Sequence, residues 1–168
     1  MDRAVAYVER LHGAVDELVA PIGAKLSARL VCRQGCSGCC TDDLSIFEVE
    51  AELIQRRHPE AVLAPPAPPG RCAMLTPEGA CRVYSARPYV CRTQGYPLRW
   101  AEAELEKRDI CPLNDDGSDL TALPEALCWT IGPIESRLAS AQALIDGGEG
   151  RRVAIRDLFG GGGGIQRP

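Results

Sequence analysis

Cysteine is the residue type in this chain with the clearest capacity for chemistry. The 168 residues include nine cysteines, and four of these lie in one short run, Cys32-Arg33-Gln34-Gly35-Cys36-Ser37-Gly38-Cys39-Cys40. The others are spread over the following part of the chain: Cys72, Cys81, Cys91, Cys111 and Cys128. Thiolates are soft ligands that select zinc, copper(I) or iron-sulfur clusters. The sequence therefore predicts a metal or cluster centre to which loops distant in sequence contribute sulfur.

A disulfide framework is the alternative interpretation of such a cysteine content. The N-terminal stretch MDRAVAYVERLHGAV carries Asp2 and Glu9 and lacks the apolar run of a signal peptide, so we expect a cytoplasmic protein. Thiols stay reduced in that compartment, and adjacent Cys39 and Cys40 could bridge each other only with strain. An odd number of cysteines also cannot all pair. We therefore favour metal binding over disulfides.

Within the run, Cys36 and Cys39 have the spacing that turns two sulfurs toward one metal while backbone N–H groups donate to them. Gly35 and Gly38 permit the backbone geometry of such a turn. Cys40 is expected to point away from Cys39, toward a second metal or as a spare thiol. The two histidines, His12 and His58, lie outside any cysteine spacing and are expected on helix surfaces.

A second, longer motif follows: Gly79-Ala80-Cys81-Arg82-Val83-Tyr84-Ser85-Ala86-Arg87-Pro88-Tyr89-Val90-Cys91-Arg92. With the first run, it resembles the CxxCxxCC family of zinc- or iron-chelating proteins, also called YkgJ-type cysteine-cluster proteins. The resemblance extends over residues 32 to 112 and takes in Cys72-Ala73-Met74-Leu75 and the late Cys111. One departure is that three residues, not two, separate Cys32 from Cys36. Cys36 and Cys39 are therefore the firmer pair.

The resemblance implies a site that holds iron or zinc through cysteine, with these candidate ligands: Cys32, Cys36, Cys39, Cys40, Cys72, Cys81, Cys91 and Cys111. We favour an iron-sulfur cluster (4Fe-4S), which relatives with methyltransferase or other extensions suggest, and keep zinc as the alternative. The Cys111-Pro112 pair also occurs in ferredoxin runs. Eight thiolates exceed the needs of one tetrahedral zinc, so two sites, or one site with spare cysteines, are both open.

Two arginines of the second motif are candidates to support the metal. Arg87 and Arg92 could donate to thiolate or cluster sulfur, although Arg87 before Pro88 could equally be a solvated turn residue. Cys128, beside Trp129, is expected to be a buried small hydrophobe instead of a ligand. Tyr84 is expected to pack in the core or in a hairpin.

Helices are expected to frame this centre. Apolar residues from 3 to 30 recur at helical spacing and predict a long helix bent near Pro21, or equally two helices that meet there. In either case the apolar face is expected to cover the cysteine-rich region. Ser45 and Glu48 form a capping-box pattern for a second helix over 46–58. A third helix is predicted from Pro124 to the glycines at 147 and 148, with a kink at Gly132-Pro133.

The segments between these helices are expected to be irregular. Residues 59–69 read as a polyproline-like connector, 77–79 as the turn of a hairpin that brings Cys72 near Cys81, and 102–107 as a helical turn. The predicted fold class is mainly α, a small helical domain around an irregular cysteine-rich metal-binding centre with a short β-hairpin. We expect one domain over 1–158 and a flexible glycine-rich tail over 159–168.

Charge and hydropathy exclude several classes of function. The net charge is -4, and basic residues are interspersed with acidic ones, so nucleic acid is not an evident partner. No apolar stretch approaches the roughly 20 residues that cross a bilayer, so no membrane association is expected. A protein partner is left open.

The expected function is metal binding in a structural, carrier or electron-transfer role. The alternative is a metal-dependent enzyme, or an accessory subunit of a modifying enzyme, with its substrate at the cysteine-bound metal. No H-E-x-x-H or similar acid-base motif supports that alternative. A thiol redox protein ranks third, because the strand-helix-strand pattern around such sites is missing.

Overall fold

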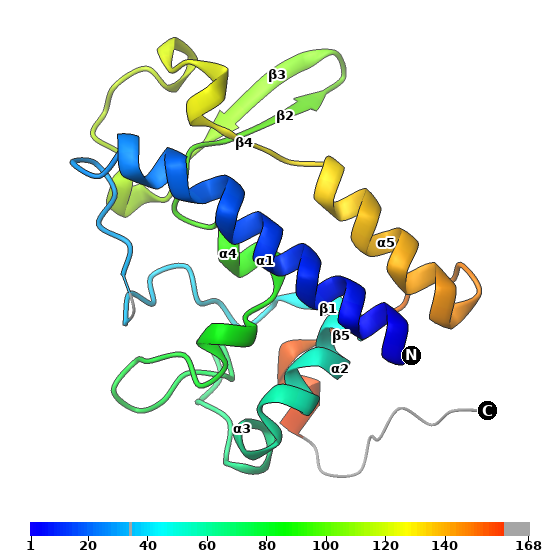
Figure 1. Ribbon diagram of the computed structural model, residues 1–168. Helices are drawn as coiled ribbons and strands as arrows, with labels where there is room; N and C mark the ends of the chain where they lie inside the picture. The colour runs from blue at the N-terminus through cyan, green and yellow to red at the C-terminus, as the bar shows by residue number, and fades with distance from the viewer. Residues whose placement is uncertain (34, 160–168) are drawn as a thin grey trace.

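The longest element of the computed structural model, which describes residues 1–33 and 35–159, is helix α1 (Asp2–Lys25). It runs across the molecule (Figure 1) and buries an apolar stripe that includes Val8, Leu11 and Val15. The helix continues through Pro21, although proline has no N–H to donate to the Glu17 carbonyl one turn earlier. Both residues are exposed, so water can bond to that carbonyl instead. It ends at Lys25, before the predicted end at residue 30.

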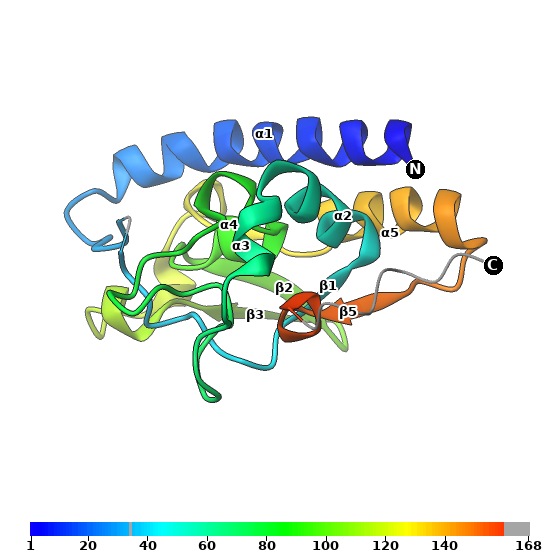
Figure 2. The ribbon, with the colours of Figure 1, turned by 90° about the horizontal axis from the view of Figure 1, so that it is seen from below.

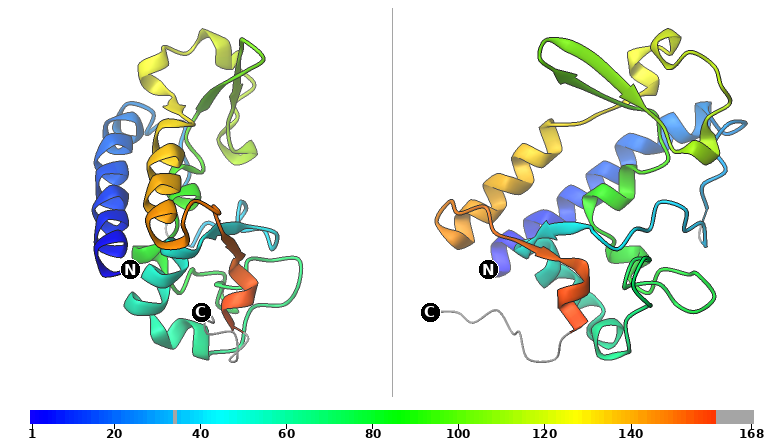
Figure 3. Two further views of the ribbon diagram at one scale, coloured as in Figure 1. Left: turned by 90° about the vertical axis from the view of Figure 1, so that its right-hand side faces the viewer. Right: turned by 180° about the vertical axis from the view of Figure 1, so that it is seen from behind.

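Helix α1 packs on three other helices, α2 (Glu48–Arg57), α4 (Tyr89–Thr93) and α5 (Pro133–Asp146). Figure 2 shows α1 as one layer above the other elements, and Figure 3 shows α1 and α5 side by side. Their shared core includes Val8, Val49 and Leu138, closed at one side by Trp129. The indole nitrogen of Trp129 donates to the Tyr89 hydroxyl at 2.7 Å.

A second core lies beneath the cysteine loops. It contains Ile46 of β1 (Ser45–Phe47), which pairs antiparallel with β5 (Arg152–Ala154), together with Met74, Leu75 and Ile155. Helix α3 (Pro59–Leu63) contributes Ala61. Cys72 belongs to this core, and Cys40 and Cys81 pack against it. The hydrophobic core thus supports the cysteine-bearing loops directly.

A further sheet contains β2 (Leu98–Glu102) between β3 (Leu105–Asp109) and β4 (Trp129–Thr130). Strands β2 and β3 form an antiparallel hairpin, and β4 pairs parallel with β2. Ala103 and Glu104 form the connecting turn with positive φ values of 48° and 67°. The predicted helical turn over 102–107 is therefore wrong, because strand pairing outweighs the helix propensity of this segment.

Short 3-10 segments connect these elements: η1 (Tyr84–Ala86), η2 (Pro112–Asn114), η3 (Leu120–Ala122), η4 (Glu125–Leu127) and η5 (Ile155–Phe159). The third predicted helix begins at Pro133, not Pro124, because Gly132 at φ 121° breaks the chain direction there. Its end at Gly147, in the left-handed conformation, is confirmed. The second helix begins at Glu48 and not at 46, and Ser45 lies in β1.

The predicted hairpin around residues 77–79 is present in short form. Leu75 and Cys81 form an isolated antiparallel bridge, and the Thr76 amide donates to the Ala80 carbonyl at 2.8 Å. The polyproline-like prediction is wrong for residues 59–63, which form α3. Helices and two small sheets together make up this cysteine-rich domain, so the mainly α prediction holds only loosely.

Two predictions concern the ends and surfaces of the chain. Of the glycine-rich tail predicted over 159–168, Phe159 ends η5 and packs against the second core, and the rest lies outside the described residues. Over the described residues, none of the helices combines the length and apolar character that crossing a membrane requires.

Candidate metal centre

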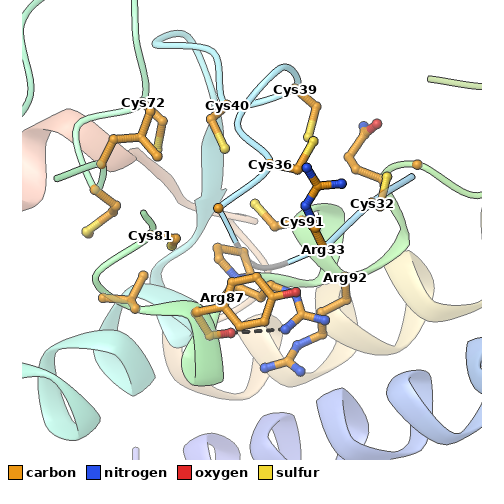
Figure 4. A pocket seen from close by; sticks show the side chains of 18 of the residues that line it. Cys32, Arg33, Cys36, Cys39, Cys40, Cys72, Cys81, Arg87, Cys91 and Arg92 are labelled. Atoms are coloured by element: carbon orange, nitrogen blue, oxygen red, sulfur yellow. Dashed lines mark hydrogen bonds between the residues drawn. The ribbon is translucent and has the colours of Figure 1, made fainter. Parts of the chain in front are cut away.

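Seven of the eight predicted cysteine ligands line one cavity of about 550 Å³. They come from separate parts of the chain: the first loop, the short hairpin and helix α4. Figure 4 shows their side chains around the same space. The seven are Cys32, Cys36, Cys39, Cys40, Cys72, Cys81 and Cys91. Cys111 lies outside the cavity wall but close enough to Cys32 to influence its ionisation electrostatically.

Backbone hydrogen bonds shape the first cysteine loop and tie it to the hairpin. The Cys36 amide donates to the Arg33 carbonyl at 2.9 Å, and the Cys40 amide donates to the Ser37 carbonyl at 3.0 Å. The Cys72 amide donates to the Cys40 carbonyl at 2.9 Å. This main-chain hydrogen bond thus holds Cys40 next to Cys72, although 31 residues lie between them in the sequence.

Four of the thiols interact with one another electrostatically in every pairing: Cys39, Cys40, Cys72 and Cys91. We call these four the cysteine quartet. The neighbouring Cys40 side chain lowers the pKa of Cys39 to about 6, and Cys39 in turn raises the pKa of Cys40. Adjacent Cys39 and Cys40 both line the cavity, so Cys40 does not point away from Cys39 as the sequence predicted.

Burial and neighbouring thiols oppose ionisation elsewhere in the quartet. Burial, followed by the electrostatic effect of Cys72, Cys81 and Cys39, raises the pKa of Cys91 to about 12. Burial is also the largest cause of the raised pKa of Cys72. A bound cation would reverse this balance, because it favours thiolate over thiol.

Two backbone amides already point at cavity sulfurs. The Met74 amide donates to the sulfur of Cys72, and the Val83 amide donates to the sulfur of Cys81. In each case the donor lies two residues after the cysteine. N–H groups aimed at sulfur in this way stabilise the charged form of a thiolate ligand. Sequence reasoning attributed such amides only to the turn at Cys36 and Cys39.

Cys32 is held by a residue that sequence reasoning did not single out. The side-chain amide of Asn114, 2% exposed, donates to the Cys32 sulfur at 3.1 Å and to the Gly95 carbonyl at 2.7 Å. Its oxygen accepts the Val31 amide at 2.9 Å. Gly95 has a φ of +99°, and a Cβ there would overlap the Cys32 sulfur. Only glycine fits both the backbone conformation and the space beside Cys32.

Arg87 and Arg92 both line the cavity, and both bond to Asp16 of α1. Arg87 also donates to the Tyr84 carbonyl at 3.1 Å, and Arg92 donates to the Ser85 carbonyl at 2.9 Å. Arg87 lowers the pKa of Cys81 electrostatically, although burial raises it by more. The arginines therefore place positive charge beside the sulfurs while their hydrogen bonds go to Asp16 and to backbone oxygens.

The remaining residues of interest take simpler positions. Cys128 is buried beside Arg108 and away from the cavity, as expected for a small core residue, although it lies before β4 and not in a helix. Tyr84 lies at the cavity and packs under the Arg87 guanidinium, 4.4 Å from ring centre to the Arg87 Cζ. Arg33 is exposed and lines the cavity, where Figure 4 shows it among the cysteines.

The cysteine sulfurs are suitable ligands for a soft metal, but in this structure they lie too far apart to bind a single ion together. Among residues 1–33 and 35–159, no three Cys, His, Asp or Glu side chains are grouped closely enough to hold one metal ion. Seven thiols nevertheless surround one space. The sulfurs are thus collected in one cavity but not drawn together around a point.

Comparison with protein families agrees with this chemistry. Residues 31–112 match the family model CxxCxxCC, described as "Putative zinc- or iron-chelating domain". The match begins just before Cys32 and ends just after Cys111, so it covers the same residues as the predicted resemblance. Searches of curated proteins and of solved structures gave no match.

Proposed function

Because the chain carries the CxxCxxCC domain over residues 31–112, we propose that it binds an iron-sulfur cluster of the 4Fe-4S type through the cysteine quartet. The observation that carries this proposal is the contrast between seven thiols around one cavity and the absence, in the described chain, of a tight three-ligand group. A single zinc ion needs its sulfurs at about 2.3 Å from one point. A cluster places several irons between its ligands and so accepts wider spacing.

The quartet supplies the four thiolates that such a cluster takes. Two of its members, Cys40 and Cys72, sit in or against the second hydrophobic core, which limits water on that side of the site. When bound, a cluster would supply one-electron chemistry or a rigid cross-link between the loops. The role that follows is structural, carrier or electron transfer.

The experiment is metal analysis of the full chain purified without oxygen. Iron with acid-labile sulfide and broad absorption in the visible range would support the cluster. Stoichiometric zinc in colourless protein would contradict the cluster and leave the coarser metal-chelating function standing.

A second candidate function is an enzyme, or an accessory subunit of one, with a substrate at the metal. The observation that favours it is cavity size, since about 550 Å³ lies within the roughly 300–1,000 Å³ of small-molecule sites. The wall also extends beyond the cysteines to Gln94 and Tyr96. A site open to substrate should let added imidazole change the spectrum of the metal-loaded protein, whereas an unchanged spectrum would argue for a closed, structural site.

A further inference from the structure

A second cavity of about 480 Å³ lies between α1, the end of α2 and the segment around η1. Its wall is mostly polar and carries none of the cysteines. His58 and Ser85 line it, and the metal-binding proposal uses neither of them. Leu53 and Ala86 add apolar surface. The volume lies within the range of small-molecule sites, so the wall offers a basic group and a hydroxyl group to a small ligand.

His58 and Ser85 belong to a chain of hydrogen bonds that ends at Glu60. His58 Nε2 lies 2.8 Å from the Ser85 hydroxyl oxygen, and His58 Nδ1 lies 3.3 Å from Glu60 Oε1. A carboxylate can only accept, so the neutral imidazole carries its proton on Nδ1 and accepts the Ser85 hydroxyl at Nε2. A hydroxyl, a base that accepts its proton and a carboxylate that orients the base are the parts of a serine nucleophile.

Backbone hydrogen bonds hold these residues in place. His58 separates α2 from α3, so the prediction that it lies on a helix surface is wrong. Its carbonyl accepts the Ala61 amide at 3.0 Å, and Glu60 lies in the first turn of α3. The Ser85 carbonyl accepts from the Arg92 guanidinium at 2.9 Å. The imidazole and the hydroxyl thus come from two fixed segments that are 27 residues apart in sequence.

A ligand in the cavity can reach the nucleophile and the base. Ser85 is exposed, and the His58 side chain is 21% exposed. The Glu60 side chain is 71% exposed, so water screens its effect on the imidazole. We therefore expect slow chemistry, in which His58 contributes more than Glu60.

The backbone amide of Ser85 supplies a donor for negative charge that develops on a substrate oxygen. The hydrogen bonds of η1 run from the Ala86 amide to the Val83 carbonyl and from the Arg87 amide to the Tyr84 carbonyl. The Ser85 amide takes part in neither bond. An amide N–H at the nucleophile is one of the donors that stabilise an oxyanion.

The charges of the wall favour an uncharged substrate. Arg57 pairs with Glu9, and Arg92 pairs with Asp16, and all four side chains line the cavity. Two positive and two negative groups therefore cancel. An anionic substrate would meet the two carboxylates, and a cationic one would meet the two guanidinium groups.

We propose that Ser85 and His58 hydrolyse small uncharged carboxylic esters in this cavity. Ser85 Oγ attacks the ester carbonyl while His58 Nε2 takes its proton, and the proton then passes to the alcohol that leaves. The acyl group remains on Ser85 Oγ. Water attacks this acyl group, His58 takes the proton of the water and returns it to Ser85 Oγ, and the carboxylic acid leaves. Ester and water thus give acid and alcohol, and the reaction does not depend on metal at the cysteines.

The first test is labelling of the full chain with a fluorophosphonate, which bonds to an activated serine oxygen with loss of fluoride. Labelling is run at pH 8.5, where histidine is ordinarily neutral, and peptide mass spectrometry locates the label. We expect label on Ser85 and a rate that falls by ~100-fold in His58→Gln. Ser140→Ala is the matched control, because Ser140 is an exposed serine of α5 that lines neither cavity.

The second test is turnover of p-nitrophenyl acetate, with melting curves to confirm folding of each variant. Ser85→Ala keeps every thiol, so it measures the background reaction of the cysteines. We expect the unmodified chain and Ser140→Ala to exceed this background over many turnovers, His58→Gln to fall to it, and Glu60→Gln to lie between. The proposal is overturned by an unlabelled Ser85, by turnover no faster than in Ser85→Ala, or by unchanged rates in folded His58→Gln.

Discussion

The side-chain amide of Asn114 donates to the sulfur of Cys32 at 3.1 Å, across 82 residues of sequence. The same side chain bonds to Val31 and Gly95, and its own backbone amide donates to the Cys111 carbonyl at 2.8 Å. One buried residue thus joins the first cysteine loop, the end of α4 and the segment of the last candidate ligand. The outer end of the cysteine cavity depends on it.

We predict that Asn114→Ala destabilises the protein and frees Cys32. Removing the amide leaves the Gly95 carbonyl without its partner and should lower the free energy of unfolding by about 1–3 kcal/mol. Urea denaturation measures this loss. Asp115→Ala, at the exposed neighbouring position, should cost less than about 1 kcal/mol. Equal losses for the two variants would contradict the anchoring role of Asn114.

The space beside Gly95 gives a second prediction. Gly95→Ala combines a positive φ with overlap between the new Cβ and the Cys32 sulfur. Gly117→Ala has a similar φ of +77° but open space, so it isolates the backbone cost. We expect about 1 kcal/mol for Gly117→Ala and at least about 2 kcal/mol for Gly95→Ala from denaturation curves. A Gly95→Ala cost no larger than the control would mean that Cys32 does not occupy the place described.

Cys39 should be the most reactive quartet thiol in the reduced, metal-free protein. Since the neighbouring Cys40 lowers the pKa of Cys39 to about 6, the Cys39 thiolate is already the main form at pH 7. Its alkylation rate should be level between pH 7 and pH 9 and fall below pH 6, whereas burial-raised Cys72 should keep gaining reactivity as pH rises. Timed iodoacetamide labelling with peptide mass spectrometry reports each site.

The variant Cys40→Ala tests the cause of this reactivity. Without the Cys40 thiol, the pKa of Cys39 should rise toward its ordinary value, and labelling at pH 7 should slow. Cys128→Ala is the matched control, because Cys128 lies outside the cavity. Unchanged Cys39 labelling in Cys40→Ala would show that another group activates it.

Removing Asp16 from its ion pair with Arg92 should destabilise the protein more than removing Arg92. The Arg92 side chain is 4% exposed and that of Asp16 is 44% exposed. Asp16→Ala leaves a buried guanidinium without its counter-ion and should cost about 3 kcal/mol. Arg92→Met leaves a carboxylate that water can reach and should cost about 1 kcal/mol. Thermal or urea unfolding compares the two, and the reverse order would contradict the burial described for Arg92.

The sequence predicted the elements whose signals are local. The apolar spacing of α1 identifies the helix even though Pro21 lies within it, and Gly147 marks the end of α5. The β2–β3 hairpin escaped prediction because Ala103 and Glu104 are residues that ordinarily favour helix, not a left-handed turn. Pairing of β2 with β4 fixes that hairpin, and no local pattern reveals such a contact.

In the candidate site too, local sequence signals were predictive and contacts between distant segments were not. Spacing and family motifs identified the cysteines, seven of which share the cavity. They did not reveal that Cys39, Cys40, Cys72 and Cys91 form a quartet, because this depends on the bond between the Cys72 amide and the Cys40 carbonyl. Nor could they identify Asn114, whose role arises only when distant segments meet. His12 was expected on a helix surface, and that prediction is wrong, because His12 is buried beside Glu50.

The most direct test of the account is the iron, sulfide and zinc content of single cysteine-to-serine variants purified without oxygen. Serine at Cys39, Cys40, Cys72 or Cys91 should lower iron and sulfide together, whereas serine at Cys128 should leave both at the level of the unmodified chain. Metal content that survives in each quartet variant, or falls equally in Cys128→Ser, would contradict the quartet as the metal-binding site.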